Sequence, residues 1–210
     1  MMRLALIVMG GVAAASMLAL IVWVYIVQNV EQPRYDLVAS AGAIEVRQYP
    51  ALVVAEVTRT GDRQSAVRAG FGPLARYIFA RDRDGAAISM TAPVTQQKIA
   101  MTAPVTQTRT DADAWTVRFI MPSAWSLETL PKPSSGDVRL LSVPPARKAA
   151  IRFSGVATDA LIAEKERELR AWLAGQGLVA AGPATYAYYN DPWTPGPLRR
   201  NEVLITLQAG

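Results

Sequence analysis

The sequence of 210 residues contains no cysteine and no histidine, which limits the chemistry that its side chains can perform. Without histidine the chain has no Ser-His-Asp triad, no HExxH zinc helix and no histidine-ligated haem iron. Without cysteine it has no disulfide, no thiolate nucleophile and no cysteine-ligated iron–sulfur cluster. No nucleophile–base pair is visible among the remaining residue types. We therefore expect a protein that is not an enzyme and that has no metal site.

A segment of eleven residues occurs twice in immediate succession at residues 88–109. The first copy reads ISMTAPVTQQK and the second reads IAMTAPVTQTR, so eight of the eleven positions are identical. Large apolar residues alternate with small or polar ones, as in half-buried strands, and a proline in such a strand lies at an edge or a bulge. The repeat predicts two neighbouring strands. These strands either line one functional site together or form a duplicated hairpin whose role is only to pack in the core.

Basic residues slightly outnumber acidic ones, but they are not clustered. The chain has 22 Lys and Arg against 17 Asp and Glu, a formal charge of +5. A nucleic-acid footprint needs clustered charge, so we expect no nucleic-acid partner. Arg199, Arg200 and Glu202 are close enough in sequence to pair with one another or across strands, and we interpret them as a structural latch.

The first thirty residues are more hydrophobic than the rest. Residues 4–27 carry no charge, and as a helix they would span about 36 Å, enough for a hydrocarbon core of about 30 Å. Trp23 and Tyr25 lie near the end of this run, where aromatic rings favour the membrane interface. The run is longer than the apolar part of a signal peptide and ends without a small-x-small site. We therefore favour an uncleaved transmembrane anchor at residues 1–30 over a cleaved signal peptide.

Arg3 precedes the apolar run, so the positive-inside rule places the amino terminus in the cytoplasm and residues 31–210 outside it. In a bacterium this would be a single-pass protein of the inner membrane with a periplasmic domain. Such a domain, having no cysteine, does not depend on disulfides there. Residues 31–210 are numerous enough for one globular core.

The pattern of residues 31–210 alternates between strand and helix. Helices are expected at residues 62–79, where Val67, Phe71, Leu74 and Ile78 recur on one face, and at residues 158–175. Glycine and proline within the first helix predict a kink or a late start. Strands are expected at residues 43–47, 52–58, 115–121, 138–143, 149–153, 185–189 and 202–207.

A longer and weaker repeat relates two halves of this region at an offset of 95 residues. It aligns strand, turn, strand and helix, so that Pro50 corresponds to Pro145 and Leu74 corresponds to Leu169. Two such halves predict an α+β domain with a pseudo-twofold axis. Its curved antiparallel sheet would carry one helix from each half.

Several segments occur in an order that resembles the SOUL haem-binding protein family. They are the two MTAPV segments, FIMPS at residues 119–123, LPKP at residues 130–133, RFSG at residues 152–155 and YNDPWTPGPLRRNEV at residues 189–203. The resemblance covers about residues 33–208. It implies a distorted antiparallel β-barrel of two pseudo-repeated halves with two flanking helices, a fold shared with effector-binding domains of some bacterial transcription regulators.

The resemblance also implies binding of haem or another tetrapyrrole, in many members without an axial histidine. Such a site needs a flat apolar wall for the macrocycle and a cation for its propionates. Phe71, Leu74 and Ile78 would form the wall. Arg68 lies where haem-binding members place an arginine, although a solvated helix charge remains an alternative interpretation.

Two further positions bear on the implied haem site. Met90 and Met101 are candidate iron ligands by side-chain type only, since such methionines usually pack in a core. Some family members use a lysine of the closing loop to bind a propionate. This loop reads Trp193-Thr194-Pro195 here, so the second cation is missing or moved.

Three functions are consistent with the sequence. The leading hypothesis is non-catalytic binding of haem or a related tetrapyrrole, which a domain tethered to the bilayer through residues 4–27 would buffer, carry or hand over. The second is a protein-interaction or envelope-structural module that has kept the fold but not the ligand. The third is a small hydrolase of the related effector-binding fold.

Overall fold

The computed structural model of the chain describes residues 11, 17–18, 30–98, 114–191 and 193–208. The predicted anchor at residues 4–27 lies almost entirely outside the described residues, and the second MTAPV segment with Met101 lies wholly outside them. Within the described part of the chain, no helix is long and apolar enough to cross a membrane. Almost all of the described structure belongs to the compact unit Glu31–Gly210.

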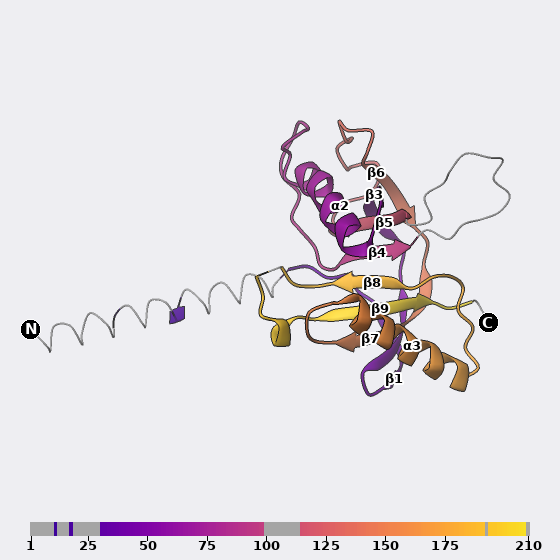
Figure 1. Ribbon diagram of the computed structural model, residues 1–210. Helices are drawn as coiled ribbons and strands as arrows, with labels where there is room; N and C mark the ends of the chain where they lie inside the picture. The colour runs from indigo at the N-terminus through magenta and orange to yellow at the C-terminus, as the bar shows by residue number, and fades with distance from the viewer. Residues whose placement is uncertain (1–10, 12–16, 19–29, 99–113, 192, 209–210) are drawn as a thin grey trace, which may run out of the picture. The chain divides into compact units, whose positions relative to one another are not determined.

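The described part of this unit is one antiparallel sheet of nine strands with two α-helices and a short 3-10 helix (Figure 1). The strands are β1 (Asp36–Ala41), β2 (Ile44–Tyr49), β3 (Leu52–Thr60), β4 (Val94–Lys98), β5 (Ala114–Ile120), β6 (Arg139–Val143), β7 (Ala146–Phe153), β8 (Thr185–Tyr188) and β9 (Asn201–Thr206). The helices are α2 (Arg63–Ile78), α3 (Asp159–Gly175) and η1 (Gly196–Leu198). The predicted α+β class is confirmed.

The order of the strands is symmetric about its centre. The sheet runs β1-β2-β7-β9-β8-β4-β5-β3-β6. Without β1, exchanging β2, β3, β4 and β5 with β6, β7, β8 and β9, respectively, gives the same strand order read from the other end. The helices obey the same exchange, since α2 follows β3 and α3 follows β7. The two predicted halves are therefore present, and they join along β4 and β8.

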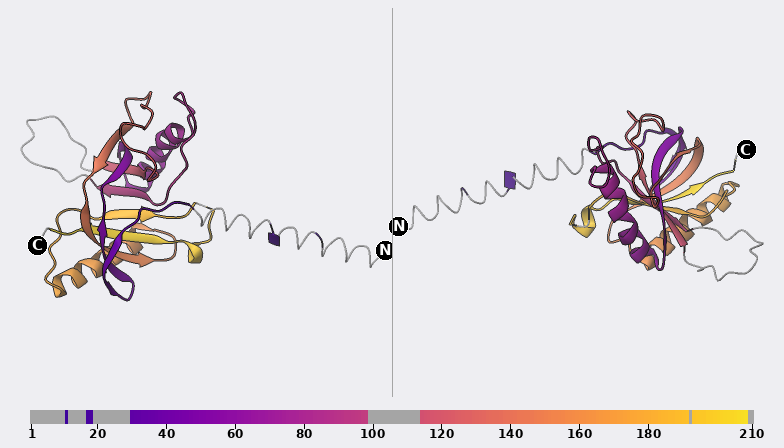
Figure 2. Two further views of the ribbon diagram at one scale, coloured as in Figure 1. Left: turned by 180° about the vertical axis from the view of Figure 1, so that it is seen from behind. Right: turned by 90° about the horizontal axis from the view of Figure 1, so that it is seen from above.

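The prediction of a closed barrel is wrong, because the strand order is linear and its end strands β1 and β6 do not pair. The sheet nevertheless curls strongly (Figure 2). Strands β2 and β3 lie near opposite ends of the order, yet only Pro50 and Ala51 separate them, a span of about 11 Å. Pro144 and Pro145 join β6 to β7 in the same way. Proline lacks the backbone N–H that hydrogen bonds between strands require. Both proline-containing connections therefore link the two ends of the sheet without adding hydrogen-bonded strand pairs there.

Both helices begin at polar capping residues. Asp62 caps α2 by accepting a hydrogen bond from the Ser65 N–H at 2.9 Å, and Thr158 caps α3 by accepting one from the Leu161 N–H at 3.3 Å. Pro73 lies inside α2, which still runs from Arg63 to Ile78. The late start considered from the sequence does not occur.

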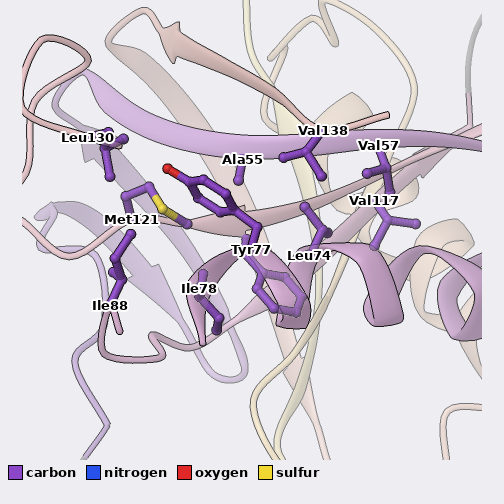
Figure 3. Close-up of a cluster of buried hydrophobic side chains, with 11 residues drawn as sticks. Ala55, Val57, Leu74, Tyr77, Ile78, Ile88, Val117, Met121, Leu130 and Val138 are labelled. Atoms are coloured by element: carbon purple, nitrogen blue, oxygen red, sulfur yellow. The ribbon is translucent and has the colours of Figure 1, made fainter. Parts of the chain in front are cut away.

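The two helices pack against the same face of the sheet. Under α2, Ala55, Val57, Val117 and Phe119 of the strands join Leu74, Tyr77 and Ile78 of the helix in one buried cluster (Figure 3). Under α3, the equivalent cluster contains Ile44, Val46, Ala149, Ile151, Leu169, Leu173, Val203 and Ile205. The strand register places these strand residues on one face, so the alternate residues of each strand face away from both helices.

Candidate functional site

The buried face of α2 is rotated from the one that its apolar spacing predicts, because Val67 also packs on the sheet whereas Phe71 is exposed. Leu74 and Ile78 are 0% and 1% exposed, inside the cluster between helix and sheet (Figure 3). Phe71, expected on the same face, is 41% exposed, whereas Gly70 is buried. Leu74 and Ile78 are core residues in this structure and do not form an exposed wall.

The close approach of α2 to the sheet at Gly70 explains this rotation. A Cβ at this position would lie 2.8 Å from Cγ2 of Val117 and 3.1 Å from Cγ2 of Val57. Only glycine lets the helix backbone come this near. Phe71, the next residue, is rotated by about 100° to the edge of the interface. Its ring still contacts Phe119 edge-on, with ring centroids 5.2 Å apart.

The exposed side of α2 carries two aromatic rings and two arginines, Arg68 and Arg76, of which Arg76 pairs with Asp82 at 3.7 Å. Arg68 and Phe71 are exposed, and Phe79 at the carboxyl end of the helix is 43% exposed. Their spacing of three and eight residues places the three side chains along one side of the helix. Within the described residues, no acidic side chain lies within ion-pair distance of Arg68, although the capping hydrogen bonds and, to a lesser extent, the Arg68 charge lower the pKa of Asp62 at the start of the helix.

The first MTAPV segment leads into the strand along which the two halves meet. Met90 is partly buried and packs against the cluster under α2. Thr91 donates its hydroxyl hydrogen to the carbonyl of Ile120, and the Thr91 side chain is buried. Strand β4 then pairs with β5 on one side and β8 on the other. The structure thus places Met90 in a packing role, while Met101 lies outside the described residues.

The loop between β8 and β9 is held by one aspartate. Asp191 accepts hydrogen bonds from the Trp193 N–H at 2.7 Å, the Thr194 N–H at 3.0 Å and the Thr194 hydroxyl at 3.0 Å. Trp193 itself is 86% exposed. The closing loop, where the resemblance implied a possible lysine, therefore holds the exposed ring of Trp193.

Four charged side chains form a network on the face of the sheet away from the helices, and we call it the Glu202 network (Glu45, Arg47, Arg200 and Glu202). Arg47 donates two hydrogen bonds to Glu202, at 2.7 and 3.0 Å, and one to Glu45 at 2.7 Å. Arg200 donates two more to Glu202, at 2.7 and 3.1 Å. The side chains of Arg47 and Glu202 are 2% and 0% exposed. The expected pairing of Arg200 with Glu202 is present, whereas Arg199 donates to the carbonyl of Thr194 at 2.7 Å. Arg47 is a further partner of Glu202 that was not predicted from the sequence.

Burial raises the pKa of Glu202, but the hydrogen bonds and charges of Arg47 and Arg200 outweigh burial and hold the pKa below its usual 4.5. A carboxylate with a depressed pKa stabilises the fold fully above the pKa of the unfolded chain. This contribution is lost as the pH falls through the folded-state pKa.

We expect the free energy of unfolding of the wild type to fall more steeply below pH 4.5 than that of Glu202→Gln, measured by urea unfolding at stepped pH. The control is Glu168→Gln, which alters a surface ion pair with Lys165 and should keep the wild-type slope. Equal slopes for the wild type and Glu202→Gln would contradict this account.

A cleft lies on the same face of the sheet as the Glu202 network. Every strand except β1 contributes to its lining: Pro33, Tyr49, Leu52, Val54, Pro93, Thr95, Arg118, Ile120, Val143, Lys148, Thr185, Tyr189 and Leu204. Its free volume is ≈ 50 Å³, far below that of sites for drug-sized ligands. This cleft was not predictable from the sequence, because its residues come from distant parts of the chain and meet only through strand pairing.

The family model described as SOUL heme-binding protein matches residues 30–206, which is most of the chain. The chain belongs to the SOUL haem-binding family. The predicted family is thereby confirmed, and the family suggests haem or another tetrapyrrole as the ligand of this SOUL domain. No curated protein sequence matches the chain.

Solved structures share the fold of the SOUL domain. The C-terminal domain of EcmrR superposes with a TM-score of 0.60 at 10% identity, covering 84% of this chain and 99% of that domain. A hydrolase from Listeria innocua gives a TM-score of 0.54 at 15% identity, covering 81% of this chain and 94% of its own. An uncharacterized conserved protein from Listeria innocua gives 0.57 at 14% identity, with the same coverage. At these identities the similarity shows the fold alone, and one fold hosts unrelated functions.

Proposed function

We propose that the chain binds haem or a related tetrapyrrole, catalyses no reaction on it, and buffers, carries or hands it over at a membrane surface. Membership of the SOUL haem-binding family carries this proposal. The exposed side of α2 supports it, because Arg68, Phe71 and Phe79 combine the two properties that a tetrapyrrole site needs.

A tetrapyrrole needs a flat apolar contact for its ring and a cation for each propionate. Phe71 and Phe79 offer partly exposed aromatic rings for the macrocycle, and Arg68 offers an unpaired guanidinium for one propionate. Leu74 and Ile78 would not contact the ligand. They pack between α2 and the sheet and so hold the helix in place. The cleft on the opposite face is too small for a macrocycle in this structure. Bound haem would contribute its iron, while the named side chains hold the ring and its carboxylates.

A membrane anchor would favour ligand capture by holding the binding domain close to the bilayer. Residues 4–27 would anchor the chain in the inner membrane, with Arg3 on the cytoplasmic side and the SOUL domain in the periplasm. An apolar planar ligand partitions into bilayers, so a domain held at the membrane surface meets it at a raised local concentration.

We expect Arg68→Ala to weaken haemin binding about tenfold or more, because a charge-assisted hydrogen bond to a propionate is lost. The measurement is a Soret-band titration of the full-length chain in detergent, with detergent alone as the blank. Arg167→Ala, which removes an exposed arginine of α3, is the matched control and should bind haemin like the wild type. Equal affinities for Arg68→Ala and Arg167→Ala would remove Arg68 from the site.

An exposed apolar patch favours a second candidate, a protein-interaction module. Trp193, Leu198 and Val156 are 86%, 68% and 56% exposed, and Gly196 brings the β8–β9 loop against Val156. This candidate replaces tetrapyrrole binding if two results occur together. Haemin does not bind the wild type, and a photo-crosslinker at position 193 captures in cells one discrete protein that Leu198→Glu no longer captures.

A further inference from the structure

The cleft on the face of the sheet away from the helices contains a cation without a counter-ion. Lys148 lies on β7 and lines the cleft together with Arg118 of β5. In the described part of the chain, no carboxylate lies within ion-pair distance of its Nζ, which lies over the Tyr49 ring at 5.6 Å from the centroid. Burial lowers the pKa of Lys148, and the charge of Arg118 lowers it further, as expected for an ammonium group without a partner.

The neighbouring acids do not neutralise Lys148 because they are already paired. The Glu202 network contains two acids and two bases, which cancel. Arg118 donates to Glu56 at 2.6 Å, and Arg139 lies 3.8 Å from the other oxygen of the same carboxylate. Arg139 is 66% exposed and does not line the cleft. Of the two cations in the lining, Arg118 is therefore paired and Lys148 is not, although a partly buried charge normally has a partner.

The rest of the lining is suited to an apolar group beside an anion. The free volume of ≈ 50 Å³ has room for roughly four water-sized groups, the size of a carboxylate with a short carbon tail. The walls are mostly aliphatic, with hydroxyl groups at a few positions: Leu52, Val54, Ile120, Val143 and Leu204 among the former, and Thr95 and Thr185 among the latter.

We propose that this cleft binds a small monocarboxylate, with the carboxylate on Lys148 and the carbon tail against the aliphatic side chains of β3, β5 and β6. A monoanion matches the single uncompensated charge, whereas a dianion would leave one negative charge buried without a partner. The site lies on the face of the sheet opposite to α2. It therefore stands independently of the tetrapyrrole site proposed for Arg68, Phe71 and Phe79.

The test uses isothermal titration calorimetry of the full-length chain in detergent, with butyrate as the probe and butyramide as its uncharged counterpart. We expect butyrate to bind with a stoichiometry of one and at least tenfold more tightly than butyramide. Lys148→Met should weaken butyrate binding at least tenfold. Lys132→Met, which removes an exposed lysine of the 122–138 loop, should leave it unchanged.

The wild-type comparison needs no variant, so a folding defect cannot decide the outcome. Lys148→Met should also unfold at the same temperature as the wild type or higher, because it removes a sheltered and unpaired charge. The proposal is overturned if the wild type binds butyrate no better than butyramide, or if Lys148→Met and Lys132→Met bind butyrate equally. Arg68→Ala should leave butyrate binding intact, so failure of the tetrapyrrole site and failure of this cleft are distinguishable.

Discussion

Replacing Arg47 with methionine is expected to lower the free energy of unfolding by about 3–5 kcal/mol, measured by urea unfolding at pH 7. The substitution removes two of the four hydrogen bonds that Glu202 receives from arginines, and the Glu202 side chain is fully buried. Arg200 still donates to Oε1 of Glu202, but Oε2 keeps only a neutral donor, the Tyr189 hydroxyl at 2.7 Å. The loss is large because a buried charge is left incompletely compensated, rather than because an ion pair is intrinsically strong.

Two variants make this prediction specific. Lys165→Met breaks a surface pair with Glu168 and should change stability by no more than about 1 kcal/mol. Arg47→Met combined with Glu202→Leu removes both buried partners and should recover part of the loss, because no fully buried carboxylate is left unpaired and Glu45 is partly exposed. A loss below about 1 kcal/mol for Arg47→Met would contradict the role assigned to the Glu202 network.

Gly70→Ala is expected to destabilise the protein by about 1–3 kcal/mol, although alanine is normally the better helix former. The new methyl group would lie 2.8 Å from Cγ2 of Val117, so either the helix or the strand must move. Gly72→Ala in the same helix is the matched control. Its nearest neighbour would be the mobile end of Arg76 at 3.7 Å, so we expect a stabilisation of up to about 1 kcal/mol.

Opposite signs for two neighbouring glycines are the outcome to look for in thermal or urea unfolding. Val117→Ala removes Cγ2 but leaves Cβ at 2.9 Å, so it should relieve part of the clash. The double variant with Gly70→Ala should therefore be more stable than the sum of the single effects predicts. If Gly70→Ala stabilises the protein as Gly72→Ala does, the close approach that turns Phe71 outward is not present.

The helices and most strands were predictable because their signals are local. Asp62 and Thr158 begin the two helices, and each cap lies three residues before the N–H group that it binds. The offset of 95 residues also predicted the two halves, since Leu74 and Leu169 hold equivalent, fully buried positions under α2 and α3. Strand β1 was missed because all six of its residues are exposed and carry no alternation.

The rotation of α2 and the buried charges were not predictable, because both depend on partners that are distant in sequence. Phe71 has the same spacing as Leu74 and Ile78, and only the approach of Gly70 to Val117 moves it outward. Arg47 and Glu202 are 155 residues apart. Nothing in a single strand indicates which of its two faces will hold a charge until the neighbouring strands are known.

Two of the sequence segments that resemble the SOUL family hold each other in the structure. Gly155 of the RFSG segment accepts a hydrogen bond from the Asn201 side chain at 3.0 Å. Its N–H donates to the Gly196 carbonyl, also at 3.0 Å. Gly155 adopts a positive φ of 105°, which favours glycine at this position. These contacts fasten the β8–β9 loop to the turn after β7.

Titration of the full-length chain with haemin, followed at the Soret band against a detergent blank, tests the central claim most directly. The account predicts a saturable spectral shift with one haemin per chain, weakened by Arg68→Ala and unaffected by Arg167→Ala. A wild-type titration that does not saturate, or that matches detergent alone, would contradict the claim that this SOUL domain binds a tetrapyrrole.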